Sequence, residues 1–138
     1  MRFVFALCLV LACSACASSP PDFDRGPAVA SDKILDRSLT MPDAAKGEVV
    51  VARWKDAAGA AIVDARIYVD GRHVANLDKG EVLRVFLAAG QHTVGVKLLG
   101  LDSTEQPVRS REIDVKSGGS YRFEVFWAGS SFDIQPKS

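Results

Sequence analysis

Short apolar runs separated by turn residues fill the chain from residue 47 onward. The clearest run lies between Tyr121 and Trp127, where apolar residues occupy every second position, as in a strand with one buried and one wet face. Such runs recur about every 8 to 12 residues, and no long helical pattern interrupts them. We therefore expect seven or eight strands, over residues 47–54, 65–69, 72–77, 81–87, 91–99, 108–115, 121–127 and a short last run over 131–135.

The stretch Ala65–Leu98 contains the densest succession of these runs. Asp70-Gly71 is typical of a type I′ hairpin turn, because both central residues of that turn need positive φ. Lys79-Gly80 and Ala89-Gly90 separate the runs that follow. The pattern predicts four consecutive antiparallel strands, a β-meander.

The expected fold class is all-β. A single open sheet would leave one apolar face uncovered, so the strands predict an antiparallel β-sandwich, immunoglobulin-like or transthyretin-like, over residues 47–138. Its interior is expected to hold one apolar face of each strand: Val49, Val51, Ile67, Val69, Leu83, Val85, Leu87, Val94, Val96, Phe123 and Val125.

The N-terminus has the pattern of an export signal. A positive charge at Arg2 precedes an uncharged apolar run over Phe3–Leu11, and small residues follow. The run is shorter than the ~20 residues that span a bilayer, which argues against a permanent membrane helix. We expect residues 1–15 to act as a signal peptide.

The end of this signal resembles the lipobox of bacterial lipoproteins, in which a cysteine is acylated after cleavage. Val10-Leu11-Ala12-Cys13 matches by residue type, whereas Cys16 leaves a signal of more ordinary length. We favour Cys13, with Cys16 as the alternative; a plain signal peptide with incidental cysteines is the third reading. Neither cysteine is followed by Asp, so the resemblance implies the outer rather than the inner membrane.

Residues 16–46 are rich in Ser, Pro, Asp and Ala and contain four prolines. Proline lacks an amide donor and restricts the residue before it, so long helices are excluded here. We expect a flexible linker whose ends lie roughly 30 Å apart. Such a linker would hold the domain away from the lipid head groups.

Composition narrows the function classes. The chain has 17 basic and 17 acidic residues, so no bulk attraction to nucleic acid is implied. All three cysteines lie in the first 16 residues, which leaves the domain without a thiol for disulfides, metal binding or catalysis. No cofactor is implied.

The segment from Ile67 to Val96 resembles the pattern that marks PEGA domains and related uncharacterised β-sandwich domains of bacterial lipoproteins. The shared positions are Ile67, Tyr68, Val69, Asp70, Gly71, Leu77, Gly80, Leu87, Gly90, His92, Val94 and Val96. The Pro-Glu-Gly-Ala motif itself would fall on residues 62–65, where only Ala65 agrees, so the lipoprotein relatives are the nearer match. The resemblance implies a small envelope domain without catalytic residues.

Few residues suggest a catalytic or metal-binding role. His92 shares a strand face with Val94 and Val96, so we expect a structural imidazole bonded to a neighbouring turn, and His73 is expected to be exposed. No ligand spacing supports a metal site, and no nucleophile motif supports an enzyme.

Two surface features remain. Arg109, Arg111 and Arg122 form either a basic stripe or, as we favour, a solvated face paired with Glu112, Asp114 and Glu124. Phe126, Trp127 and Phe132 form either core or an exposed aromatic platform for a glycan or small ligand. The sequence thus predicts a noncatalytic, lipid-anchored interaction module with an envelope protein partner, with ligand binding near Trp127 as the alternative.

Overall fold

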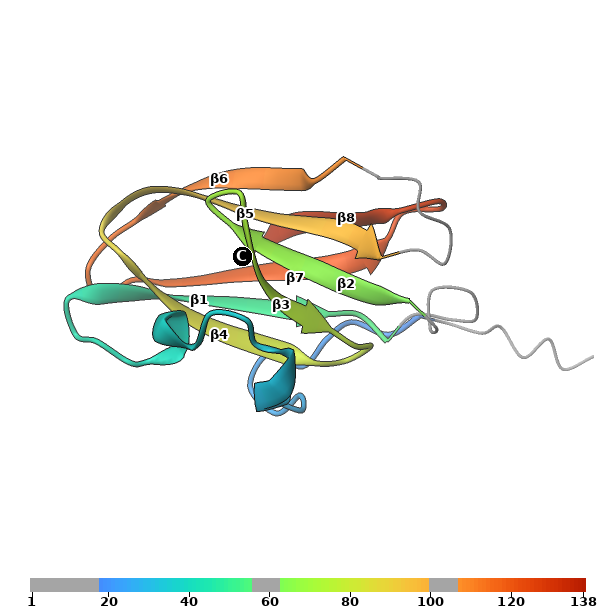
Figure 1. The fold of residues 1–138 in the computed structure, drawn as a ribbon, viewed down its shortest axis with the longest axis horizontal. Coiled ribbons are helices and arrows are strands. Elements are labelled where there is room, and N and C mark those ends of the chain that lie inside the picture. The colour runs from blue at the N-terminus through green and yellow to red at the C-terminus, as the bar shows by residue number, and fades with distance from the viewer. Residues whose placement is uncertain (1–17, 56–62, 100–106) are drawn as a thin grey trace, which may run out of the picture.

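The computed structural model describes residues 18–55, 63–99 and 107–138. Among these residues, eight strands form two four-stranded sheets that pack face to face, which confirms the all-β sandwich (Figure 1). The first sheet has the order β4-β1-β7-β8 and consists of β1 (Lys46–Arg53), β4 (Val82–Ala88), β7 (Ser120–Trp127) and β8 (Phe132–Lys137). The second has the order β3-β2-β5-β6 and consists of β2 (Asp64–Val69), β3 (Arg72–Leu77), β5 (Gly90–Leu99) and β6 (Arg109–Val115).

Every residue predicted for the interior is buried between the sheets. The alternation that predicted the strands therefore also predicted their inner faces, because side chains of a strand alternate between its two sides. Asp70 and Gly71 both have positive φ, as the predicted type I′ hairpin between β2 and β3 requires.

The predicted β-meander is wrong. After the β2–β3 hairpin the chain crosses to the first sheet as β4, which pairs with β1, and then returns as β5, which pairs with β2. The crossing places Leu83, Val85 and Leu87 of β4 in the core opposite the strands of the second sheet. The alternation of apolar and polar residues determines which side chains of a strand are buried, but it does not determine which strand it pairs with.

The strand order also separates the two expected architectures. In an immunoglobulin sandwich the first, second, fourth and fifth strands share one sheet. Here the first strand lies with the fourth, seventh and eighth, and β1 and β7 run parallel, so the order differs from that of the immunoglobulin sandwich and leaves the transthyretin-like alternative. The other five strand pairs are antiparallel.

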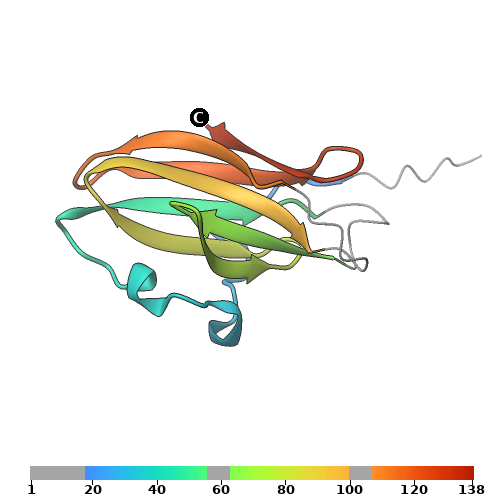
Figure 2. The ribbon, with the colours of Figure 1, turned by 45° about the horizontal axis from the view of Figure 1, so that its top comes forward.

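The segment over residues 18–45, which we call the covering segment, differs from the flexible linker expected over residues 16–46. It passes along β4 and β3 and contains two short 3-10 helices, Ser31–Lys33 and Arg37–Thr40 (Figures 1 and 2). Phe23 and Val29 each keep only 8% of their surface exposed. Its prolines exclude long helices but allow an extended chain that buries isolated apolar side chains.

Phe23 explains why β1 is apolar on both faces. Val49 and Val51 enter the main core, while Val50 and Ala52 point the other way and form a second buried cluster with Phe23 and Val82. Without the covering segment this outer face of β1 would expose aliphatic surface to water.

Candidate functional site

The edge strands on the two sides of the sandwich differ in whether other parts of the chain bond to them. On one side, β3 and β4 are the edge strands, and the covering segment satisfies part of their backbone. The Val29 amide donates to the Val82 carbonyl at 3.1 Å, the Val82 amide donates to the Pro27 carbonyl at 2.9 Å, and the Leu35 amide donates to the Val74 carbonyl at 2.8 Å. We call this the covered side.

On the other side, β6 and β8 are the edge strands, and no strand of the described residues pairs with their outer edges. We call this the open side. Arg109 and Arg111 of β6 share a strand face with buried Ile113 and reach Asp133 of β8, with nitrogen to oxygen distances of 3.7 Å and 3.2 Å. These ion pairs connect the two sheets where the core ends.

A groove of about 610 Å³ opens on this side. Its lining comes from three strands and the residue after β8: Arg111, Glu112, Ile113, Ser120, Tyr121, Arg122, Phe123, Pro136, Lys137 and Ser138. Ile113 and Phe123 are core residues, so the floor of the groove is apolar, while three cationic side chains and one carboxylate stand around it. The combination suits an apolar group carried by a polar or anionic chain.

The groove contains part of the predicted basic stripe. Arg111 and Arg122 both line it, whereas Arg109 lies beside Asp133. The expected partners of these arginines are wrong: Arg111 pairs with Asp133, and Arg122 pairs with Asp24 of the covering segment at 3.0 Å. Strand alternation placed the arginines, but the acids that meet them come from distant parts of the chain.

The aromatic platform that the sequence left as an alternative is not assembled. Phe126 and Trp127 are adjacent in β7 and therefore point to opposite faces of the sheet. Phe132 is only 1% exposed and packs edge-to-face against Trp127 with ring centroids 5.3 Å apart. The guanidinium of Arg53 lies 4.5 Å from the centre of the Phe132 ring. Phe132 therefore belongs to the core and Trp127 packs against it, as the core interpretation predicted.

His92 is bonded to the β2–β3 turn, as expected of a structural imidazole, and also to the last residue of β4. Its Nδ1 lies 2.7 Å from Asp70 Oδ2 in the β2–β3 turn, and its Nε2 lies 2.8 Å from the Ala88 carbonyl oxygen. Partial burial opposes the charged ring, but the hydrogen bonds to Asp70 and Ala88 raise the pKa of His92 above 6.5. Both partners are acceptors, so the ring satisfies both when each nitrogen carries a proton.

His73 differs from its expected exposure. It is half-buried, stacks on Tyr68 with ring centroids 5.3 Å apart, and its Nε2 lies 2.7 Å from Asn76 Oδ1. Across the described residues, no group of three or more His, Cys, Asp or Glu side chains is placed to hold a metal ion.

A polar cluster lies at the other end of the strands from His92 and was not predicted from the sequence. Lys33 of the covering segment bonds to Asp78 and Glu81, which flank the turn between β3 and β4. A hydrogen bond with Asp78, together with burial and the nearby Asp78 charge, raises the pKa of Asp64. Arg53, nearly inaccessible to solvent, donates to the carbonyls of Val63 and Leu77. Each of these groups bonds to neighbouring elements, so the cluster joins the covering segment to the sandwich.

No protein-family model matches the chain, and no curated protein matches it either. In the part of the chain that the structure describes, no helix has both the length and the apolar character required to cross a membrane. The candidate acylation sites Cys13 and Cys16 lie outside the described residues.

Proposed function

We propose that this protein is a lipid-anchored protein of the bacterial envelope, acylated at Cys13 or, as the alternative, at Cys16, and held at the outer rather than the inner membrane. Its sandwich acts as a noncatalytic interaction module. The apolar leader and the lipobox-like residues around the two cysteines support the anchor. The partner is another envelope protein; nucleic acid is not a partner.

The observation that carries the binding role is the contrast between the four sheet edges. The covering segment bonds to the β3 edge at Val74 and to the β4 edge at Val82, and Pro136 removes an amide donor from β8. This leaves β6 as the edge with a run of seven residues that can pair with another chain. The apolar floor of the groove lies beside it, between β6 and β7.

In the proposed complex, an extended segment of the partner pairs with the outer edge of β6 and places an apolar side chain in the groove. Main-chain hydrogen bonds supply affinity, and the groove selects the side chain. Arg109 and Arg111 point inward from β6, a device that weakens indiscriminate pairing between edges. A weak interaction suffices because the lipid anchor raises the local concentration of the module.

The anchor is tested by radiolabelled palmitate incorporation into the wild type, Cys13→Ser and Cys16→Ser. We expect labelling of the wild type and its loss in Cys13→Ser. Loss in Cys16→Ser alone would move the anchor to the alternative cysteine, and an unlabelled wild type would contradict the anchor altogether.

The binding edge is tested with a photo-crosslinking amino acid at Glu112 of β6 and, as a matched exposed acid on the covered side, at Asp32. We expect a discrete crosslinked product in intact cells from position 112 and none from position 32. Equal products at both positions would mean that the β6 edge is not the binding surface.

The alternative of glycan or ligand binding near Trp127 finds no support in this arrangement, because Phe126 and Trp127 face opposite ways and Phe132 is buried.

A further inference from the structure

The covering segment is fixed to the sandwich close to the proposed anchor. The Ser19 amide donates to the Lys55 carbonyl at 3.2 Å, and the Lys55 amide donates to the Ser19 carbonyl at 3.1 Å. These two hydrogen bonds form an antiparallel bridge between Ser19 and Lys55, which is the second residue after β1. The chain between anchor and domain therefore ends at Ser19, and the 27 residues from there to Ala45 add nothing to its reach.

The remaining tether is short. Two residues separate Cys16 from Ser19, and five separate Cys13 from Ser19. A fully extended chain spans at most about 3.6 Å per residue, so the Cα of Ser19 lies within about 11 Å of the Cα of Cys16, or about 22 Å of that of Cys13. The ~30 Å spacer expected from the sequence is thus absent.

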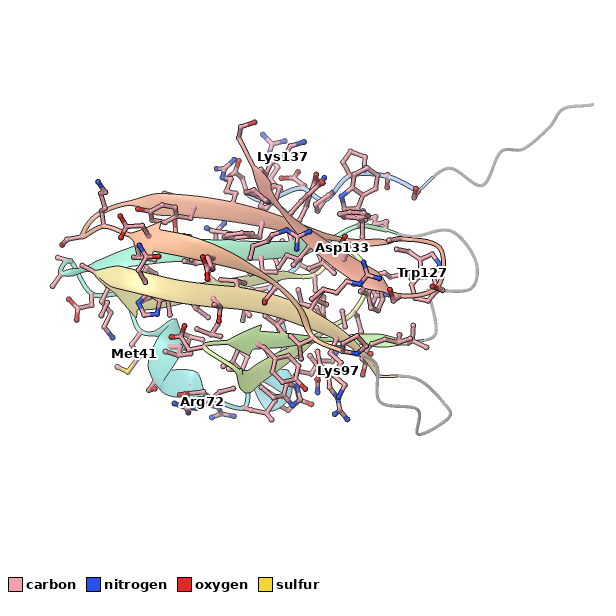
Figure 3. All side chains as sticks on the ribbon, turned by 90° about the horizontal axis from the view of Figure 1, so that it is seen from above. Met41, Arg72, Lys97, Trp127, Asp133 and Lys137 are labelled. Atoms are coloured by element: carbon pink, nitrogen blue, oxygen red, sulfur yellow. The ribbon has the colours of Figure 1, made fainter. Side chains whose placement is uncertain are left out.

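The bridge also determines which end of the sandwich lies near the lipid. Trp54 and Lys55 follow β1, and because β1 and β7 run parallel, Trp127 closes β7 at the same end (Figure 3). Lys79 lies in the adjoining turn, whose next residue, Gly80, donates its amide to the Arg53 carbonyl at 3.0 Å. We call Trp54, Lys55, Lys79 and Trp127 the anchor end.

The chemistry of this end suits a lipid surface. The chain has two tryptophans, and both lie here, partly buried: Trp54 donates its N–H to Glu124 at 3.0 Å, and Trp127 packs against Phe132. Lys55 and Lys79 are exposed. Tryptophan is enriched at membrane interfaces, because its ring is apolar and its N–H is polar, and lysine ammonium groups bind phosphate head groups.

We propose that the anchor end rests on the head groups of the membrane that holds the acyl chains, and that the groove on the open side points away from it. This inference rests on the proposed lipid anchor. The groove begins at Ser120, at the far end of β7, and a strand of eight residues is about 26 Å long. The groove is therefore presented toward proteins beyond the lipid surface, while the β6 edge runs along the side of the sandwich from near the anchor end to the far end.

The two tryptophans make the orientation measurable without a label. The acylated protein, purified from membranes, is reconstituted in vesicles of phosphatidylethanolamine and phosphatidylglycerol, with or without a phospholipid that carries a nitroxide quencher on its head group. We expect the nitroxide lipid to quench the tryptophan fluorescence of the wild type. A reporter variant, Trp54→Phe with Trp127→Phe and Lys116→Trp, moves the fluorophore to the exposed turn at the far end and should lose the quenching.

A second variant keeps both tryptophans and inserts a long Gly-Ser stretch between Ala17 and Ser18. It should remain on the vesicles but lose most of the quenching, because the bridge at Ser19 no longer holds the anchor end near the lipid. This variant decides the question if the reporter variant fails to fold.

The outcomes separate the two proposals. A wild type that does not float with the vesicles contradicts the lipid anchor. A wild type that floats but is not quenched, or is quenched no more than the reporter variant, overturns the orientation and leaves the anchor standing.

Discussion

The covered side and the open side are built from the same kind of edge strand but are held by different forces. On the covered side, Phe23 and Val29 are buried, and backbone hydrogen bonds reach one residue of each edge strand, Val74 of β3 and Val82 of β4. On the open side, partly exposed ion pairs from Arg109 and Arg111 to Asp133 join the sheets. Burial of apolar surface stabilises strongly, whereas exposed ion pairs contribute little. The covered side is therefore partly closed by packed apolar groups, whereas the open side is joined by exposed ion pairs.

The largest effect is expected at Phe23. Phe23→Ala removes the ring that covers Val50, Ala52 and Val82, and should lower the free energy of unfolding by about 3 kcal/mol, independently of salt. Urea denaturation measures it. Leu35→Ala is the matched control, because Leu35 lies in the same segment but is 56% exposed. Equal losses in the two variants would contradict a specifically packed covering segment.

A smaller loss is expected at Gly26, where the covering segment touches β4. A Cβ added there would lie 2.6 Å from the Asp22 carbonyl oxygen and 2.6 Å from Val82 Cγ2. Gly26→Ala should therefore push the segment outward and reduce stability by about 2 kcal/mol. Thermal unfolding reports this loss. Unchanged stability would mean that the segment has room to move, contrary to close packing.

His92 belongs to neither the covered side nor the open side, and an effect of intermediate size is expected there. His92→Gln should cost about 1 kcal/mol at pH 5 and less at pH 8.5. The raised pKa of His92 gives stability that is complete below pH 6.5 and is lost as the pH rises through its folded-state pKa.

Asp70, the partner of His92, determines how the stability from this pair changes at acid pH. Burial opposes its charge, but the bonds from His92 and the Thr93 amide lower its pKa below 3.8. Its contribution is present above pH 3.8 and is lost as the pH falls through the folded-state value. Unfolding curves between pH 3 and 9 measure both limits. A His92→Gln loss that grows with rising pH would be the wrong sign.

The smallest effect is expected on the open side. Asp133→Asn removes the charge that meets Arg109 and Arg111, whose side chains are nearly half exposed, and should cost no more than about 0.5 kcal/mol. The loss should shrink toward zero in about 1 M salt, because screening weakens exposed ion pairs. A loss as large as that of Phe23→Ala would erase the difference between the two sides.

The sequence predicted what depends on local pattern. The strands and their inner faces follow from alternation, and the β2–β3 turn follows from Asp70-Gly71. Pairing did not follow, because β4 has the same pattern whether it continues the hairpin or crosses to β1. Phe23 and Val29 are isolated apolar residues among prolines and acids, so nothing local indicated that they are buried.

The candidate site was predicted less well than the fold. Arg111 and Arg122 were singled out, but their partners Asp133 and Asp24 come from the last strand and from the covering segment. The alternation along β7 already put Trp127 and Phe126 on opposite faces, but the edge-to-face packing of Trp127 on Phe132 depends on β8. The groove is a product of where β8 ends relative to β6 and β7, which no single segment encodes.

Amide hydrogen exchange tests the central contrast most directly. The amides of Val29, Leu35 and Val82 are bonded donors on the covered side and should exchange slowly, while the outward-facing amides of β6 should exchange rapidly. If the amides of Val29 and Leu35 exchange as fast as those of an unfolded chain, the covering segment is loose, the two sides are equally open, and the account is contradicted.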